Sequence, residues 1–402
     1  MVLGSRRRIV TISPSLIGYC TNVHAGRDLV ETRQQLECHA VEVKRQFSPT
    51  RPMGIGLWLS AAAASRLTDV SQLQEFAEWL DAEGLVPFTL NGFPYGDFHQ
   101  PVVKHRVYEP TWFESARSDY TVQLIEILDR LLPSGAAGSI STLPIGWGTP
   151  RPDETQKRRA AQYLLEISVE LERLEQQTGR FICLCLEPEP GCLLERSSDI
   201  VDFFETYLLP GSDEQRVRRY LQVCHDVCHA VVMFEEQDQV LSRFAAAGIG
   251  VGKVQISSAV VVRWDQLDPG QRQAARRQLA AFAEDRYLHQ TMVRSPDGTL
   301  SFHEDLPPLV ADQSAQPLEG EWRIHFHVPI YLERFGLLEG SRPAIEECLN
   351  CLDSSPEPPH YEAETYAWGV LPDDLRQPDL ATGIARELSW LRAATGSGTH
   401  LD

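Results

Sequence analysis

Short apolar runs alternate with longer amphipathic segments from residue 16 to residue 257. In the segment 71–80, Leu73, Phe76 and Leu80 recur at helical spacing before Gly84, and residues 154–179 form a second, charge-rich helical segment. Near-continuous apolar strands that alternate with helices indicate a parallel sheet covered on both faces. The strands of seven such units are predicted at residues 16–22, 54–60, 86–93, 139–144, 181–187, 221–226 and 251–257. One more unit would close a (β/α)8 TIM barrel.

The pattern is less regular after residue 263. Residues 287–294 and 299–303 have the pattern of two strands joined by Ser-Pro-Asp-Gly, a hairpin turn, and residues 322–329 form a further strand. There are then nine strand candidates for eight places in the barrel, so either 322–329 or 251–257 belongs to an insertion, and we favour 322–329. The rest of the chain contains predicted helices at 342–352 and 379–395 and a closing strand at 360–368. The sequence predicts one domain over 1–402, with a β-rich insertion at about 263–340 before the last barrel strand.

The composition of the chain limits the kinds of molecule that it is expected to bind. The chain has 402 residues and a formal net charge of −19, which argues against nucleic acid or an anionic membrane surface, since both reward clusters of Lys and Arg. The basic cluster Arg6-Arg7-Arg8 lacks the apolar core of a secretory signal, and no run approaches the length of a membrane span. We therefore expect a cytoplasmic protein that acts on a small molecule and does not insert into membranes.

The nine cysteines are an odd number, and Cys183, Cys185 and Cys224 lie inside apolar runs. This arrangement favours reduced, buried thiols over a disulfide framework. Cys348 and Cys351 form a lone CxxC in a predicted helix, where two core thiols are a better interpretation than a zinc site, because no second pair lies nearby.

Polar residues at the ends of the predicted strands are the candidates for chemistry, because the active sites of parallel barrels lie there. The run Cys-Leu-Cys-Leu leads directly into Glu187 and Glu189, which point the same way if the strand continues. A carboxylate at the end of so apolar a strand needs a metal or a salt bridge to offset its desolvation. Glu189 could serve only to support Glu187.

The next strands end in the same way. Asp226 and His229 follow one strand, and both can face the barrel mouth, although a lone histidine such as His229 could instead cap the next helix. Gln255 lies within an apolar strand and needs a partner for its amide, and Glu364 lies on the same face of the closing strand as Glu362. Glu187, Asp226, Gln255 and Glu364 together make an oxygen-rich site, which suits one Mg²⁺ or Mn²⁺ ion.

These motifs resemble those of the xylose-isomerase-like barrels, which include hydroxypyruvate isomerase and the ketose 3-epimerases. The resemblance rests on Glu-Pro at 187, Asp-x-x-His at 226, Val-Gln-Ile around 255 and a Glu at 364. It implies that Glu187, Asp226, Gln255 and Glu364 bind the metal and that His229 contacts the substrate.

Longer stretches resemble the EboE proteins, "metabolite traffic" barrels encoded beside a prenyltransferase and a sugar-cyclising synthase. The matching segments are residues 17–24, 88–96, 139–144, 325–329 and 364–368. This resemblance implies a cyclitol or sugar-like substrate.

The predicted insertion carries His325-Phe-His327, and alternation places both histidines on one face of a strand. They are either extra metal ligands or buried histidines with local hydrogen bonds. If His327 ligates the metal, Zn²⁺ or Fe²⁺ becomes plausible. Further strand-end residues that could line the pocket are Asn91, Tyr95, Tyr19 and His24.

Three functions fit these residues. The first is an isomerase or epimerase in which Glu187 and Glu364 transfer a proton through an enediolate while the metal binds neighbouring substrate oxygens. The second is a metal-dependent hydrolase on the same barrel, and the third is a non-catalytic carrier of the metabolite. Homodimers are common among such barrels, although no feature of this chain requires one.

Overall fold

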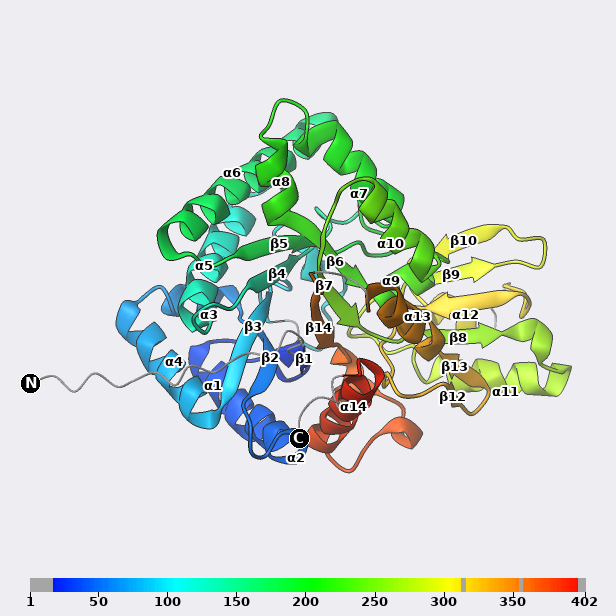
Figure 1. Cartoon of the computed structure of the whole chain (residues 1–402). Coiled ribbons are helices and arrows are strands. Elements are labelled where there is room, and N and C mark those ends of the chain that lie inside the picture. Colours follow the sequence, from blue (N-terminus) through cyan, green and yellow to red (C-terminus); the bar gives the residue numbers. More distant parts are fainter. Residues whose placement is uncertain (1–16, 98, 312–315, 354–356, 397–402) are drawn as a thin grey trace, which may run out of the picture.

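Eight parallel strands form the barrel in this computed structural model, which describes residues 17–97, 99–311, 316–353 and 357–396 (Figure 1). The sheet order is β1-β14-β7-β6-β5-β4-β3-β2, and a parallel bridge between Cys20 and Gly56 joins its two edges. Arg6-Arg7-Arg8 and residue 16 of the first predicted strand lie outside the described residues. The strands are β1 (Ile17–Tyr19), β2 (Met53–Trp58), β3 (Leu85–Asn91), β4 (Gly138–Thr142), β5 (Ile182–Leu186), β6 (Leu221–Asp226), β7 (Val251–Ile256) and β14 (His360–Ala363).

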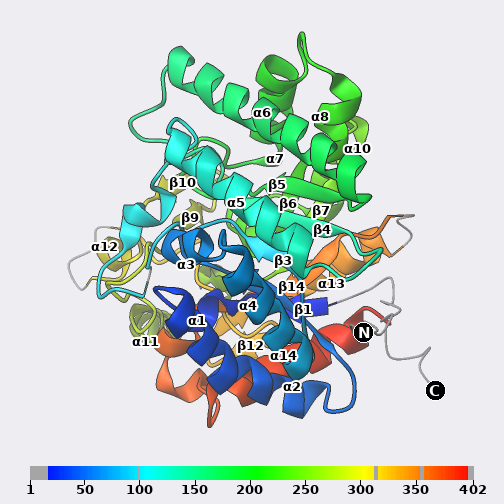
Figure 2. The same ribbon diagram turned by 90° about the vertical axis from the view of Figure 1, so that its left-hand side faces the viewer.

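Amphipathic helices cover the outside of these strands (Figure 2). The predicted helix after residue 71 is α4 (Val70–Glu83), which Asp69 caps and which ends at Gly84 in the left-handed conformation (φ +67°). The second predicted helix is α6 (Glu154–Thr178), which begins with a capping box at Asp153. The other outer helices are α1 (Leu29–Gln35), α2 (Val41–Phe47), α3 (Ala61–Arg66), α5 (Ser115–Leu131), α7 (Ser197–Phe203), α8 (Glu214–Tyr220), α10 (Gln237–Ala246), α13 (Arg342–Leu352) and α14 (Leu380–Ala394). Helix α9 (Val227–Val232) follows β6, and all of its residues are buried.

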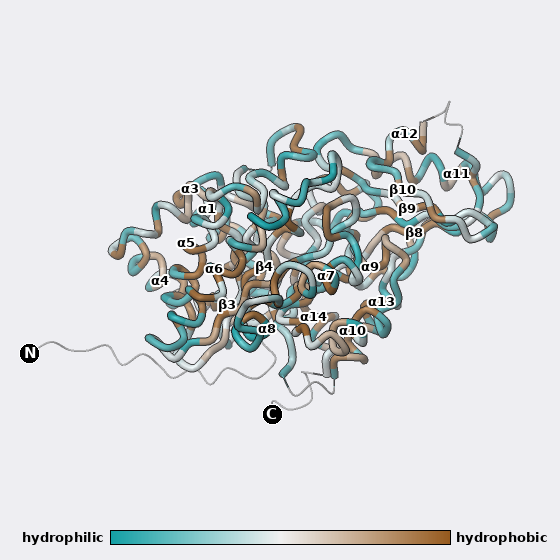
Figure 3. Tube along the Cα trace, turned by 90° about the horizontal axis from the view of Figure 1, so that it is seen from above, coloured by the Kyte–Doolittle hydropathy of each residue, from teal (hydrophilic) through white to brown (hydrophobic). Residues whose placement is uncertain are grey.

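A second sheet, which projects from one side of the barrel, separates β7 from β14 in the sequence (Figure 3). The strand order in this sheet is β10-β9-β11-β8-β13-β12, and adjacent strands are antiparallel. The prediction of a β-rich insertion before the last barrel strand is confirmed, and the strand within 322–329, not the one within 251–257, belongs to it. Its elements are β8 (Val260–Arg263), α11 (Pro269–Ala280), β9 (Thr291–Arg294), β10 (Leu300–His303), α12 (Pro307–Val310), β11 (Glu321–Ile324), β12 (Arg334–Phe335) and β13 (Leu338–Gly340).

Several predicted strands are shorter in the structure: residues 20–22 lie outside β1, residues 287–290 lie outside β9, and two other strands end early. Strand β11 stops at Ile324, because the Phe326 amide turns back to the carbonyl of Ile324 and leaves the ladder, so His325 and His327 follow the strand and do not lie on it. Strand β14 stops at Ala363, and Tyr366–Val370 form a 3-10 helix. Polar residues expected on strands therefore lie on the segments that leave them.

All nine cysteines are free thiols, and Cys183, Cys185 and Cys224 are buried as predicted. In the CxxC pair, Cys348 is buried whereas Cys351 is exposed, so only one of the two is a core thiol. Within the described part of the chain, no helix is both long and apolar enough to cross a membrane.

Candidate metal centre

A cavity of about 90 Å³ lies where the barrel strands end. The barrel contributes polar side chains to its wall, among them Asn22, Asn91, Glu187, Gln255 and Glu364. The insertion contributes the opposing wall, with Tyr287, Leu288, Gln290, His325 and His327. The cavity therefore forms only because the insertion folds over the mouth of the barrel.

Three carboxylates approach one another at the barrel side of the cavity. Glu187, Asp226 and Glu364 each place an oxygen within 4.8 Å of the other two, and all three are buried. Glu187 follows β5, Asp226 ends β6 and Glu364 follows β14, so the register of three strands brings them together.

Several oxygens of this carboxylate cluster and of Gln255 accept no hydrogen bond from the described residues. No described residue donates a hydrogen bond to Oε2 of Glu187, Oδ2 of Asp226 or Oε1 of Gln255. The other oxygen of Asp226 accepts from the His229 amide (2.8 Å) and from the Ser257 hydroxyl (2.8 Å). Buried acceptors without donors are costly. A divalent cation with oxygen ligands would satisfy all three, so these residues fit the metal that the sequence implies.

Neighbouring amides fix the direction of these oxygens. The Gln255 amide nitrogen donates to Oδ1 of Asn91 (2.9 Å), which leaves Oε1 of Gln255 as the unpartnered atom. The Asn22 amide nitrogen donates to Oε1 of Glu364 (2.7 Å). Such contacts orient metal ligands before the ion arrives.

Burial and mutual repulsion oppose ionisation at this cluster. Burial raises the pKa of Glu187 well above its ordinary value, and the charges of Glu364 and Asp226 add to the effect. Burial, followed by the charges of Asp226 and Glu362, raises the pKa of Glu364 to about 8. A cation would lower both pKa values, since it stabilises the carboxylates.

A buried ion pair lies beneath the carboxylates. Nζ of Lys253 contacts Oε2 of Glu362 at 2.6 Å, and both side chains are fully buried. Lys253 also donates to Oδ1 of Asn91 (2.8 Å). Burial alone would lower the pKa of Lys253, but the charges of Glu362, Cys224 and Cys20 and the hydrogen bond to Glu362 together outweigh it, so the net shift is upward. Gly56 makes room for this pair, because a Cβ there would overlap Oε1 of Glu362.

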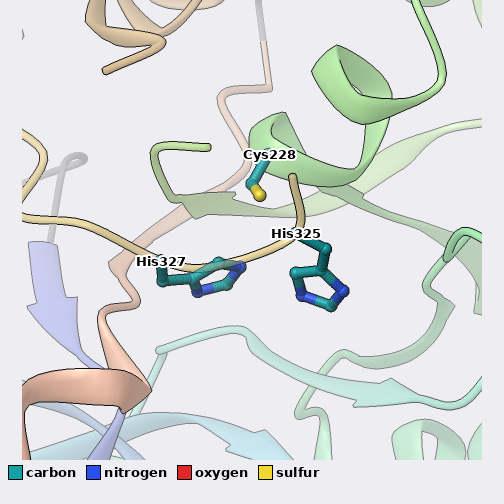
Figure 4. A group of neighbouring side chains, drawn as sticks. All are labelled: Cys228, His325 and His327. Carbon is teal, nitrogen blue, oxygen red and sulfur yellow. The ribbon is translucent and has the colours of Figure 1, made fainter. Parts of the chain in front are cut away.

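Three histidines line the side of the cavity nearest the insertion. Nε2 of His229 lies 3.2 Å from Nε2 of His325, and Nε2 of His327 lies 3.9 Å from Oδ2 of Asp226. No described residue bonds either ring nitrogen of His327. Figure 4 shows the imidazoles of His325 and His327 next to each other on the segment after β11, with Cys228 of α9 nearby.

The sequence matches no protein-family model, and it matches no curated protein at a significant level. Among solved structures, the chain is similar to a xylose isomerase-like TIM barrel protein from Mycobacterium smegmatis in complex with magnesium (TM-score 0.52, 13% identity, 96% of this chain and 99% of that one). The chain has a xylose-isomerase-like TIM-barrel fold.

Two further structures are similar at lower TM-scores. An L-ribulose 3-epimerase aligns with a TM-score of 0.48 and 12% identity over 95% of both chains. The IOLI protein with a bound zinc atom aligns with a TM-score of 0.46 and 11% identity over 96% of this chain and 99% of that one. At such identities the likeness concerns the fold alone.

The xylose-isomerase-like barrel brings most of the predicted site residues to one cavity. Glu189 lines it and accepts a hydrogen bond from the Tyr108 hydroxyl (2.6 Å). Tyr95 instead lines a separate surface pocket, and Tyr19 and His24 are bonded to each other (2.8 Å) away from the cavity. Asp226 does not line the cavity wall, although its carboxylate belongs to the cluster.

Sequence reasoning missed four residues that hold the site together: Asn22, Lys253, Tyr108 and Gln290. Lys253 carried a readable signal, because a charged residue two positions before Gln255 in the same apolar strand needs a buried partner. Asn22 ends the first predicted strand and so had the same strand-end signal as Asn91. Nothing local marks Tyr108, which reaches Glu189 from the end of a 3-10 helix (Lys104–Tyr108) that is distant in the sequence.

Proposed function

We propose that this protein is a divalent-metal-dependent isomerase or epimerase that acts on a sugar or cyclitol-type polyol. The observation that carries the proposal is a set of buried oxygens on Glu187, Asp226 and Gln255 to which none of the described residues donates. They lie beside Glu364 at the ends of the barrel strands. These four residues would hold one Mg²⁺ or Mn²⁺ ion, because their donors are oxygens. When bound, the ion would act as a Lewis acid toward two neighbouring substrate oxygens.

Glu187 and Glu364 would move the proton. They leave β5 and β14, which β6 and β7 separate in the sheet, so the two carboxylates reach the cavity from different strands. One would remove a proton from the carbon next to the substrate carbonyl, which gives an enediolate. The other would return a proton to the opposite face of that carbon and invert it.

His229 would bind a substrate hydroxyl. Its Nδ1 is bonded to the Pro188 carbonyl (2.8 Å), so its Nε2 is left to face the cavity. Asn91 and Glu189 also line the wall and could bind further hydroxyls. The resemblance to the EboE proteins supports a place in a biosynthetic cluster for a prenylated or cyclitol metabolite. The free thiols are in keeping with a cytoplasmic protein.

Solvent deuterium exchange tests the proposal. Protein loaded with Mn²⁺ or Mg²⁺ would be incubated in D₂O with a panel of ketopentoses, ketohexoses and cyclitol ketones, and products would be followed by NMR. We expect deuterium at the carbon next to the carbonyl of at least one compound. We also expect exchange to disappear in Glu187→Gln and Glu364→Gln, both checked for fold by circular dichroism.

Glu78→Gln is the matched control, because Glu78 is exposed on α4 and bonds Gln74, away from the cavity. Exchange that survives in both site variants would contradict the proton-transfer roles. Tight binding of a panel compound without any exchange would favour a carrier of the metabolite over an enzyme.

A further inference from the structure

The hydrogen bonds of His229 fix where its proton lies. Nδ1 of His229 is 2.8 Å from the backbone oxygen of Pro188. A carbonyl oxygen only accepts, so Nδ1 must carry the hydrogen. In the neutral ring, Nε2 of His229 therefore presents a lone pair.

The same reasoning applies to His325. Its Nδ1 is 2.9 Å from Oε1 of Gln290. The amide nitrogen of Gln290 faces the Pro190 carbonyl (3.2 Å), an obligatory acceptor, so the oxygen of that amide is the atom turned toward His325. Nδ1 of His325 therefore donates, and its Nε2 also presents a lone pair.

The two nitrogens with lone pairs lie next to each other. Nε2 of His229 and Nε2 of His325 are 3.2 Å apart, and both side chains are buried. Two acceptors at this distance repel unless a cation lies between them. Two imidazoles bound to one Zn²⁺ at about 2.0–2.1 Å in tetrahedral geometry have their nitrogens about 3.3 Å apart. The observed spacing therefore fits two nitrogens that bind one metal ion.

Glu189 can supply a third ligand. Glu189, His229 and His325 place ligand atoms within 4.8 Å of one another, and no described residue bonds Oε2 of Glu189. The Tyr108 hydroxyl holds the other oxygen (2.6 Å). Each imidazole donates from its far nitrogen to an oxygen, as metal-bound histidines do in proteins.

We propose that His229, His325 and Glu189 hold a second divalent cation, beside the oxygen-rich site. Two nitrogens and one carboxylate suit Zn²⁺ or Fe²⁺ better than Mg²⁺. The site exists because the insertion places His325 opposite α9. It uses none of the four oxygen ligands of the proposed function, although His229 and Glu189 line the same cavity. In protein that holds only the first ion, Nε2 of His229 remains available to a substrate hydroxyl.

Metal counting separates the two sites. Native protein saturated with Mg²⁺ would be titrated with Zn²⁺, and bound metals would be measured by mass spectrometry after gel filtration. We expect two divalent ions per chain. His325→Gln should lose the nitrogen-bound ion and keep the other, whereas Glu187→Gln should do the reverse. His303→Gln, in the same insertion but outside the cavity, is the control.

The outcomes distinguish this inference from the proposed function. One ion in native protein, lost in Glu187→Gln and kept in His325→Gln, would overturn the second site and leave the first. One ion lost in His325→Gln and kept in Glu187→Gln would support the second site and contradict the first.

X-ray absorption on the zinc of native protein needs no variant, so it decides the matter even if His325→Gln fails to fold. We expect two imidazoles in the first shell at about 2.0–2.1 Å. A shell of oxygens alone, or no bound zinc, would mean that a shared proton occupies the place between the rings and would overturn the proposal.

Discussion

The barrel wall and the insertion wall of the cavity hold their polar atoms in different ways. On the barrel side, the Glu187 amide bonds Thr142 of β4 (3.0 Å) and the Glu364 amide bonds Ile256 of β7 (3.0 Å), so both residues continue the parallel sheet. On the insertion side, β11 ends at Ile324, and Gln290 holds His325 in two ways: its carbonyl accepts from the His325 amide (2.9 Å), and its side-chain oxygen lies 2.9 Å from Nδ1 of the His325 ring. The register of the parallel sheet positions the barrel wall, whereas the insertion wall depends on backbone and side-chain contacts of the segment that follows β11.

The chemistry of the walls differs accordingly. The barrel offers oxygens, packed so closely that burial and repulsion raise the pKa of Glu187 and Glu364. The insertion offers nitrogens from His325 and His327. The comparison suggests that proton transfer depends on the barrel, whereas the insertion adds ligands and closes the cavity.

The largest expected effect is on the rate of catalysis, and it distinguishes the barrel wall from the insertion wall. Glu364→Gln removes a proton-transfer group, and we expect deuterium exchange to fall by about 10²–10⁴-fold. His327→Gln changes a residue that neither donates to nor accepts from a described neighbour, and we expect a loss of about 10-fold at most, as for a group that supports ligands. Rates come from NMR in D₂O. Equal losses in the two variants would remove the distinction between the walls.

The next effect concerns stability. Lys253→Met leaves the fully buried Glu362 without its cation, and we expect the free energy of unfolding to fall by about 3–5 kcal/mol. Arg334→Met, in the insertion, breaks a pair in which the arginine side chain is 70% exposed, and should cost about 0–1 kcal/mol. Urea titrations followed by circular dichroism measure both. Similar costs would show that Lys253 is not the electrostatic support of the barrel site.

Two neighbours of the ligands provide a finer test. Asn22→Ala frees Oε1 of Glu364 and should weaken the oxygen-bound ion about 10–100-fold. Gln290→Ala frees Nδ1 of His325 and should weaken only the nitrogen-bound ion, by a similar factor. Calorimetric titrations with Mg²⁺ and Zn²⁺ give the affinities. If each variant weakened both ions alike, the two walls would form one shared site.

The smallest effect is on pH dependence in metal-free protein. The pKa of Glu364 is about 8 in the folded chain and near 4.3 in an unfolded one, so its protonation stabilises the fold below about pH 4.3 and this stability is lost as the pH rises through 8. Between pH 7 and 8 we expect a loss on the order of 1 kcal/mol. Thermal unfolding with chelator measures it, and Mn²⁺ should reverse the trend. A flat profile with chelator would contradict the raised pKa.

The barrel and the clustering of its strand-end oxygens could be predicted because each depends on a short stretch of sequence. An apolar run ending in Glu187, Asp226 or Gln255 determines both the strand and the place of its last side chain. The parallel arrangement then brings the ends together without any further information.

The histidine cluster needed contacts that no local pattern contains. The sequence predicted His325 and His327 on one face of a strand, but β11 ends before both, and their meeting with His229 depends on how the insertion packs. The partners Tyr108 and Gln290 are 182 residues apart and could not be paired from spacing. Likewise, Tyr95 was predicted in the pocket, although it packs edge-on against Tyr120 at a ring distance of 5.1 Å.

Manganese binding to the oxygen-rich site tests the central claim most directly. Metal-free native protein, Glu187→Gln and the surface control Glu78→Gln would be titrated with Mn²⁺ and followed by electron paramagnetic resonance. We predict one tight Mn²⁺ site in native protein and in Glu78→Gln, and an affinity at least roughly 100-fold weaker in Glu187→Gln. Equal Mn²⁺ affinity in native protein and Glu187→Gln, or no tight site in native protein, would contradict the account.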